Sequence, residues 1–433
     1  MNNPISNASA SRVGIIAWCG YDWACSAFNT IVTTFVFATF FTKSIAVNPV
    51  VGTTQWGNAI ALAGLIIAFS SPIFGAIADY QGPRKPWLAM FTLLAMVASA
   101  LLWFAKPSVN YTTWILGCVI VGTIGYEIAS VFYNAMLRDI APPGYLGRIS
   151  GWGWASGYLG GLISLSIALF AFIKTNATWL QLDNSAAESI RICGPFVALW
   201  FLLFSWPLFV FTKDRPARGI PITTAVKQGL TVLANTLRQL HQHRTIVCYL
   251  FARMIYTDGI NTIFAFGGIY AVGTFGMTTS EVILFGIGMN VAAGIGAVVF
   301  AWVDDFIGAK PTILISLVAI IANGLVIVIT KDITWFWVFA AALCLFVGPV
   351  QAASRSLMAR LAPVPLMTEM FGLYAFSGKA TAFMGPWLLA LITERTGSQR
   401  AGIGTILIFL AVGMLFLYFV PVARENVRSR KIS

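Results

Sequence analysis

Charged residues are scarce in this sequence, and their scarcity restricts the kind of protein it can form. Asp, Glu, Lys and Arg together make up 10% of the 433 residues, and hydrophobic residues make up 58%. Soluble domains carry about 25% charged residues. A soluble fold of this length could not cover its surface with so few charges. A lipid bilayer accepts an apolar exterior and favours helices, whose backbone groups bond internally. We therefore expect an all-α membrane protein.

Residue patterns on which enzymes and metal centres depend are also rare or absent. The sequence has only two histidines, both within a polar stretch, and its six cysteines are scattered without a CxxC spacing. It contains no phosphate-binding loop, nucleophile elbow or zinc-ligand spacing. We expect no enzymatic activity, no metal and no cofactor. The net charge of +12 could suggest a nucleic-acid partner. Its positive residues gather in alternate loops, however, which indicates membrane orientation instead.

Long apolar runs are abundant, and runs of roughly 20 residues predict membrane-spanning helices. We expect about twelve spans, a number that suits a 433-residue chain made mostly of such runs. They cover residues 13–42, 56–79, 87–106, 111–139, 150–174, 193–213, 245–275, 280–303, 311–330, 334–361, 367–393 and 401–423. The longest polar connection is 213–244. We therefore predict a six-helix bundle at 1–212, a cytoplasmic linker at 213–244 and a second six-helix bundle with a short basic tail at 245–433.

The distribution of Lys and Arg predicts the orientation of the chain. Most of these residues fall in the linker, the termini and the loops on the same side, so this side is expected to be cytoplasmic. We predict an integral multi-pass protein of a bacterial inner membrane, or of the vacuolar membrane in a eukaryotic host. We expect a monomer in contact with the lipid bilayer.

A short polar turn between two apolar runs is the most informative motif. It contains Gly75, Asp79, Gly82, Arg84 and Lys85. Gly75 would let two helices pack closely, and Gly82 would permit a tight turn. Asp79 could pair with Arg84 or accept bonds from the N-terminus of a neighbouring helix. We interpret the motif as an ionic latch that holds two helices together in one state of the protein.

A weaker copy of this turn occurs in the second half of the chain. It contains Asp305, Gly308 and Lys310, which align with Asp79, Gly82 and Arg84 at a constant offset (305 − 79 = 226). A block around residues 140–142 likewise recurs at 361–363, at an offset of 221. Such duplication predicts two pseudo-symmetric halves, an architecture typical of secondary transporters.

Ionisable residues inside the predicted spans are the candidates for a functional site. Each costs about 2.5–3.5 kcal/mol near the bilayer centre on insertion scales, so each requires a partner or a wet cavity. The candidates for substrate binding or coupling are Asp22, Glu127, Arg253, Asp258, Arg355 and Lys379, with Gln351 one turn before Arg355. A carboxyl among them could carry a proton, and an arginine could bind a substrate carboxylate or close an inner gate by pairing with Asp22. Static salt bridges between helices are the alternative.

The repeated turn resembles the signature loop of the major facilitator superfamily. Further blocks resemble the autophagy-related vacuolar effluxer branch and its bacterial relatives; they lie at 21–28, 132–142, 256–259 and 351–356. The resemblance implies two bundles that rock about a central site on the first, fourth, seventh and tenth helices. It also implies secondary transport of a small molecule, with amino-acid efflux, proton coupling or facilitated diffusion expected. Export of drugs or metal-chelating metabolites, and a receptor or scaffold without transport, are the alternatives.

Overall fold

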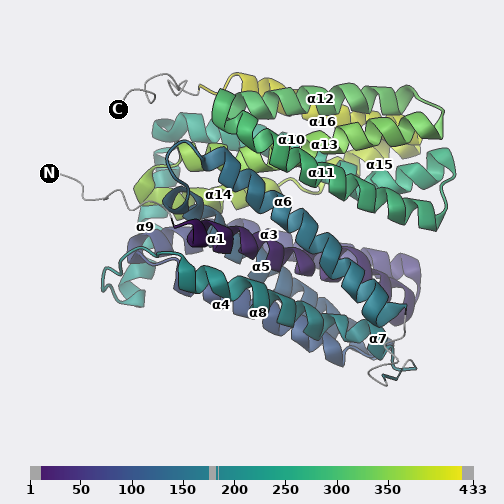
Figure 1. Ribbon diagram of the computed structural model, residues 1–433, viewed down its shortest axis with the longest axis horizontal. Coiled ribbons are helices and arrows are strands. Elements are labelled where there is room, and N and C mark those ends of the chain that lie inside the picture. The colour runs from purple at the N-terminus through teal and green to yellow at the C-terminus, as the bar shows by residue number, and fades with distance from the viewer. Residues whose placement is uncertain (1–10, 175–181, 184, 422–433) are drawn as a thin grey trace.

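The computed structural model describes residues 11–174, 182–183 and 185–421, and within these ranges every regular element is helical. The N-terminal half lies along the long axis of the molecule (Figure 1). Its elements are α1 (Arg12–Ala27), η1 (Phe28–Phe35), α2 (Val36–Phe40), η2 (Phe41–Ile45), α3 (Pro49–Gln81), α4 (Lys85–Leu101), η3 (Leu102–Phe104), η4 (Val109–Tyr111), α5 (Thr112–Ile140), α6 (Leu146–Ile167), η5 (Ala168–Ile173), α7 (Glu188–Arg191) and α8 (Cys193–Phe211).

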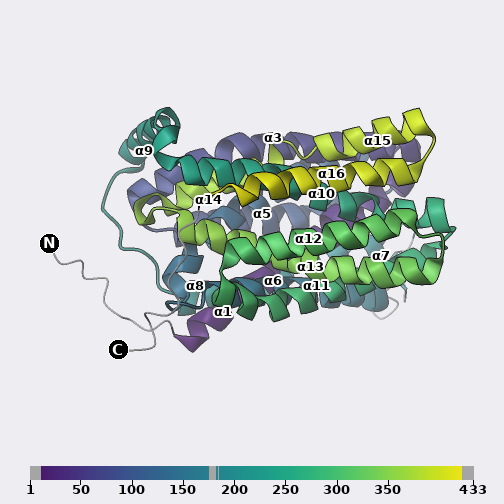
Figure 2. The ribbon, with the colours of Figure 1, turned by 90° about the horizontal axis from the view of Figure 1, so that it is seen from above.

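The C-terminal half lies beside it with its helices along the same axis (Figure 1). Between the halves the chain forms α9 (Ile222–Arg238) and η7 (Leu240–His243). The second half consists of α10 (Arg244–Phe275), α11 (Thr279–Ile307), α12 (Ala309–Ile329), α13 (Ile333–Leu361), η8 (Val364–Leu366), α14 (Met367–Lys379), α15 (Met384–Thr396) and α16 (Gln399–Tyr418). We call the end of the molecule where α1 begins and α9 lies the latch end (Figure 2).

The expected all-α membrane fold is confirmed. In the described residues, eleven helical segments are long and apolar enough to cross a membrane. The 32-residue helix α10, which carries Arg253 and Asp258, is not among these eleven, although it is long enough to be the twelfth expected span. Capping residues mark where helices begin or end at the loops opposite the latch end. Asn48 accepts the Val51 N–H at 2.9 Å, Thr278 and Glu281 form a capping box, and Gly276 ends α10 in the left-handed conformation.

Three predicted spans are less regular than their apolar runs suggest. The first contains two π-helical segments, η1 and η2, and the fifth ends in another, η5. The eleventh, expected as one helix over 367–393, breaks at 380–383 between α14 and α15. Pro386 supplies a physical reason, because its ring has no N–H for the carbonyl of residue 382 and would collide with that carbonyl in a continuous helix. The break lies midway along the spanning segment.

Small residues allow the two halves to approach closely near the latch end, where α3 packs on α14 and α6 packs on α11. A Cβ atom added at Gly75 would lie 2.5 Å from the carbonyl oxygen of Thr368, and one at Gly372 would lie 2.5 Å from that of Ser71. A Cβ atom at Gly151 would lie 2.6 Å from the carbonyl oxygen of Ala297. Both cross-half contacts therefore depend on backbone-to-backbone approach.

We predict that Gly372→Val separates α3 from α14 and destabilises the protein by about 1–3 kcal/mol, the usual cost of overpacking. The melting temperature of the purified protein in detergent should fall. Gly117→Val is the matched control, because a Cβ atom there meets no atom within 4 Å. Equal melting temperatures for the two variants would contradict the close packing.

Candidate functional site

Asp79 joins the two halves at the latch end. Its buried carboxylate, on α3, accepts the backbone N–H groups of Thr368 at 2.7 Å and Glu369 at 2.9 Å, and the Thr368 hydroxyl at 2.7 Å. Thr368 and Glu369 belong to the first turn of α14, whose N–H groups have no partner within the helix. A negative charge is favoured there by the helix dipole as well. We call this arrangement the first latch.

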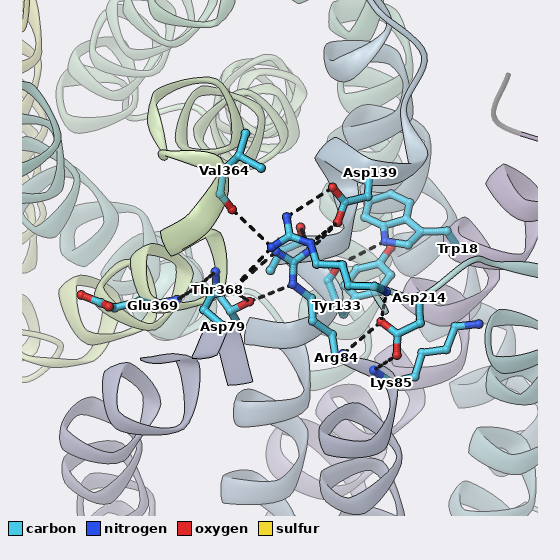
Figure 3. A network of polar contacts seen from close by, with 12 residues as sticks. Trp18, Asp79, Arg84, Lys85, Tyr133, Asp139, Asp214, Val364, Thr368 and Glu369 are labelled. Carbon is cyan, nitrogen blue, oxygen red and sulfur yellow. Dashed lines mark hydrogen bonds and ion pairs between the residues drawn. The ribbon is translucent and has the colours of Figure 1, made fainter. Parts of the chain in front are cut away.

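Arg84 completes the first latch (Figure 3). Its fully buried guanidinium donates to Thr368 Oγ1 at 2.8 Å and to Asp139 Oδ2 at 2.6 Å, and lies 3.7 Å from Asp79 Oδ1. Gly82, with φ of 110°, adopts the left-handed backbone that the turn before Arg84 requires. The motif thus makes both of the contacts that its sequence allows: an ion pair within the turn and bonds to a neighbouring helix.

The connection that follows α8 also takes part in the first latch. Asp214 accepts the backbone N–H groups of Arg84 and Lys85, each at 3.0 Å, and so caps α4. Arg215 lies 3.2 Å from Asp139 and 3.8 Å from Asp79 and donates to the carbonyl of residue 364 at 3.2 Å. This connection is therefore bound to both halves.

Asp305 forms a second latch with opposite connectivity. It lies on α11 in the C-terminal half and accepts the backbone N–H groups of Gly147 at 2.7 Å and Arg148 at 3.2 Å, in the first turn of α6. Beside it, Asp304 pairs with Arg360 at 2.6 Å. Each half therefore provides one carboxylate that caps a helix of the other half.

The sequence repeat aligns Lys310 with Arg84. In the structure, however, Lys310 makes the same kind of contacts as Lys85. Lys310 Nζ donates to the carbonyls of Tyr418 at 2.8 Å and Val420 at 2.7 Å, at the end of α16. Lys85 Nζ donates to carbonyls at the end of α8, including that of residue 209 at 3.0 Å. Between its glycine and its lysine, the second turn is one residue shorter than the first. Its glycine, Gly308, has a φ of 94°. Each lysine is followed directly by a proline, and this signal would have identified the pair.

Asp22 and Arg355 form an ion pair between the halves. Arg355 donates to Asp22 Oδ2 at 2.9 Å, to Ser150 Oγ at 3.0 Å and to the Ser150 carbonyl at 2.6 Å. The Tyr133 hydroxyl donates to Asp22 at 2.8 Å, and the guanidinium carbon lies 4.9 Å from the centre of the Trp18 ring. Of the two roles considered for Arg355, the structure shows pairing with Asp22, and the network leaves the guanidinium 3% exposed.

A second cross-half ion pair joins Glu127 on α5 to Lys379, the last residue of α14, at 2.6 Å. Their side chains are 24% and 30% exposed, which is unusual for charges in the middle of spanning segments. Gln351 also bridges the halves, accepting a bond from the Tyr158 hydroxyl at 2.5 Å. The Glu127–Lys379 pair is therefore partly exposed, whereas Asp79, Arg84, Asp305 and Arg355 are almost wholly buried.

Arg253 and Asp258 do not pair, and each has a buried atom without a hydrogen-bond partner in the described chain. Arg253 donates from one terminal nitrogen to the Tyr374 carbonyl at 2.7 Å and the Ser377 hydroxyl at 2.8 Å, while its Nε has no acceptor. Asp258 Oδ2 accepts the Gly385 N–H at 3.0 Å, while Oδ1 has no donor. These two residues are the unsatisfied members of the set predicted for substrate binding or coupling; in the signature turn, one terminal nitrogen of Arg84 also has no hydrogen-bond partner among the described residues.

Sequence reasoning missed several charges that complete the latches: Asp139, Asp214, Arg215, Asp304 and Arg360. They lie near helix ends, where charges are common and carry little information. One signal was available. Asp139 and Arg360 each precede the repeated 140–142 and 361–363 block directly (139 + 221 = 360). The paired positions carry opposite charges: the first latch has an acid, Asp139, where the second has a base, Arg360.

No cluster of three potential metal-binding His, Cys, Asp or Glu side chains occurs in the described residues.

The fold has close counterparts among solved structures. The crystal structure of FucP, a major facilitator superfamily transporter in the outward conformation, matches with a TM-score of 0.76 over 95% of this chain and 99% of that one, at 14% identity. The proton:xylose symporter XylE matches with a TM-score of 0.71 over 94% of both chains, also at 14% identity. A model of the superfamily also matches residues 5–165. The chain therefore has the fold of these transporters, and its N-terminal part resembles the superfamily in sequence.

The chain belongs to the family described as vacuole effluxer Atg22 like, whose model matches residues 145–429. A relative from Bacillus subtilis, the uncharacterized MFS-type transporter YxiO, is 28% identical over 94% of both chains. Autophagy-related protein 22 of Yarrowia lipolytica is 26% identical over 61% of this chain and 48% of its own. These relatives confirm the resemblance inferred from the sequence and place the protein among transporters rather than enzymes.

We predict that neutralising Asp22 alone is more harmful than neutralising both Asp22 and Arg355. Asp22→Asn leaves a buried guanidinium without its counterion, which costs about 3–5 kcal/mol for a buried pair. Asp22→Asn combined with Arg355→Gln removes the uncompensated charge. The melting temperature should fall strongly in Asp22→Asn and recover partly in the double variant. A double variant less stable than both single variants would contradict this account.

Proposed function

We propose that the protein is a secondary transporter that moves a small solute by alternating access, with amino-acid efflux as its activity and proton movement as its driving force. The moving units are the bundles at 1–212 and 245–433, connected by the linker at 213–244. The observation that carries the proposal is the set of reversible polar contacts between the halves. Two carboxylates that cap helices of the opposite half, Asp79 and Asp305, and two ion pairs join the halves. Such a contact can form in one state and break in another without covalent change.

The position of these contacts supports a state that is closed at the latch end. Asp79 and Asp305 lie near the latch-end termini of α3 and α11, and Asp22 lies within the first helix. At the opposite end, α15 packs on α10 and α16 of its own half. In the proposed cycle, the latches open and the opposite end closes around the solute.

Glu127 is the proposed carrier of the coupling proton. It is the more exposed acid of the two cross-half ion pairs, at 24% against 18% for Asp22, and its partner Lys379 is the last residue of α14 before the helix break. Protonation of Glu127 would remove its charge and release Lys379. The contact between α5 and α14 would then loosen, so protonation would be coupled to the separation of the halves.

The linker supports a cytoplasmic latch end. Lys213, Arg215, Arg218, Lys227 and Arg238 give it a strong positive charge, as expected for a cytoplasmic segment. We propose that the protein resides in a bacterial inner membrane, or in the vacuolar membrane of a eukaryotic host, and acts as a monomer.

Transport into proteoliposomes tests the proposal. We predict that a panel of labelled amino acids contains at least one transported solute, that a pH gradient stimulates its movement, and that Glu127→Gln abolishes this stimulation while leaving exchange without a gradient. Glu394→Gln is the matched control, since Glu394 is exposed and forms no ion pair among the described residues. Movement of drugs or metal chelators without any amino acid would reject the proposed substrate. Undiminished stimulation in Glu127→Gln would reject the proposed proton carrier.

A further inference from the structure

Helix α10 approaches the break between α14 and α15 with two charged side chains of opposite sign. Arg253 contacts Tyr374 and Ser377 in the last turns of α14, and Asp258 contacts Gly385 in the first turn of α15. The two residues are five positions apart, which corresponds to about 7.5 Å along a helix axis. Interrupted helices whose ends approach charged groups near the middle of a membrane are typical of substrate sites in transporters.

Arg253 is a buried cation without a counterion. It is 9% exposed, and no carboxylate lies within 4.0 Å of it among the described residues. Its guanidinium carbon lies 3.4 Å from the centre of the Tyr374 ring, which fixes its plane. The buried arginines Arg84 and Arg355 both have carboxylate partners. An uncompensated buried charge is costly, so its retention here requires a reason.

The pseudo-symmetry of the two halves explains why Arg253 has no carboxylate partner. The Trp18 indole donates to the Tyr133 carbonyl at 3.1 Å, and the Tyr249 hydroxyl donates to the Ser354 carbonyl at 2.7 Å. Tyr249 is therefore the counterpart of Trp18 (18 + 231 = 249), and Arg253 is the counterpart of Asp22 (22 + 231 = 253). Asp22 receives its countercharge from position 355 on α13.

The position on α5 equivalent to 355 is Asn134 (355 − 221 = 134). Asn134 is uncharged, and its side-chain oxygen accepts a bond from Arg355 at 3.2 Å. The symmetric countercharge for Arg253 is therefore missing from the protein itself. A ligand that carries a carboxylate could supply it.

At two glycines, α14 and α15 approach the buried charged groups with no side chain in between. A Cβ atom at Gly378 would lie 3.1 Å from one terminal nitrogen of Arg253 and 3.4 Å from the other. A Cβ atom at Gly385 would lie 3.1 Å from Asp258 Oδ1, the oxygen that has no donor. Lys379, directly after Gly378, is 30% exposed, whereas Arg253 and Asp258 beside the break are buried.

We propose that the break between α14 and α15 binds a zwitterionic solute, with Arg253 holding its carboxylate and Asp258 holding its ammonium group. The inference rests on the proposed transport function and locates the substrate. The unsatisfied donor, Arg253 Nε, and the unsatisfied acceptor, Asp258 Oδ1, match the two charges of the ligand. A carboxylate alone would leave Asp258 unsatisfied, and an amine alone would leave Arg253 unsatisfied.

Ligand-induced thermal stabilisation of the purified, full-length protein tests this site, because a solute that binds only the folded state raises the melting temperature. Three mixtures serve as probes: L-amino acids, the carboxylic acids that lack the amino group, and the amines that lack the carboxyl group. We expect only the amino acids to stabilise the wild-type protein. Arg253→Gln and Asp258→Asn should each weaken the half-saturating concentration by about tenfold or more, as expected when a charged hydrogen bond is lost.

Gly378→Ala keeps every charge and serves as a second variant that is expected to fold. Its methyl group would crowd the guanidinium edge, so stabilisation by amino acids should weaken again. Arg400→Gln is the matched control, because Arg400 also donates to carbonyls at a helix end, those of Val328 and Ile329, but far from the break. It should retain the full effect.

Three results would overturn the site: equal stabilisation by acids or amines, an unchanged response in both Arg253→Gln and Gly378→Ala, or no response of the wild-type protein to amino acids. Transport separates the site from the proposed function. If amino acids are transported at wild-type rates by Arg253→Gln and Asp258→Asn, the transporter assignment stands and the location of its substrate is wrong. If no amino acid is transported or stabilises the protein, both fail.

Discussion

A buried carboxylate must find donors, and for Asp79 and Asp305 these donors belong to the other half of the molecule. Asp79 and Asp305 each accept two backbone N–H groups from the first turn of a helix in the opposite bundle. A helix N-terminus offers such donors and a favourable dipole without requiring a second buried side chain. The close glycine contacts along α3–α14 and α6–α11 bring the backbone near enough for these bonds. The remaining cross-half contacts depend on this approach.

Pseudo-symmetry relates the two halves in backbone and in contacts, but it does not preserve charge. Asp139 corresponds to Arg360, and Asp22 corresponds to Arg253. The change of sign between Asp139 and Arg360 leaves neither charge unpaired, because Asp139 pairs with Arg84 and Arg360 pairs with Asp304. The change between Asp22 and Arg253 leaves Arg253 without a countercharge. A duplicated structure can thus acquire an asymmetric site by changing charges at equivalent positions. We infer that this asymmetry distinguishes the side that binds substrate from the side that closes the inner gate.

The fold could be predicted from sequence because it depends on composition and on segment length. A chain with 10% charged residues and about twelve long apolar runs has few alternatives to a helical membrane bundle. The signature turns were also found, since their glycine and aspartate positions repeat at one offset. The partners of the buried charges were harder to predict. Glu127 and Lys379 are 252 positions apart, and a single sequence contains no information that joins them. The break in the eleventh span was missed, although Pro386 marks it, because the whole segment is long and apolar enough to read as one span.

The central claim is that the carboxylates of Asp79 and Asp305, each capping a helix of the opposite half, hold the halves together at the latch end. Its most direct test is the distance between spin labels at the exposed residues Lys213 and Val364, measured in Asp79→Asn combined with Asp305→Asn. Asp332→Asn is the control, because Asp332 caps α13 within its own half. We expect the double variant to populate a longer distance that is absent in the wild-type protein and in the control. An unchanged distance distribution in the double variant would contradict the account.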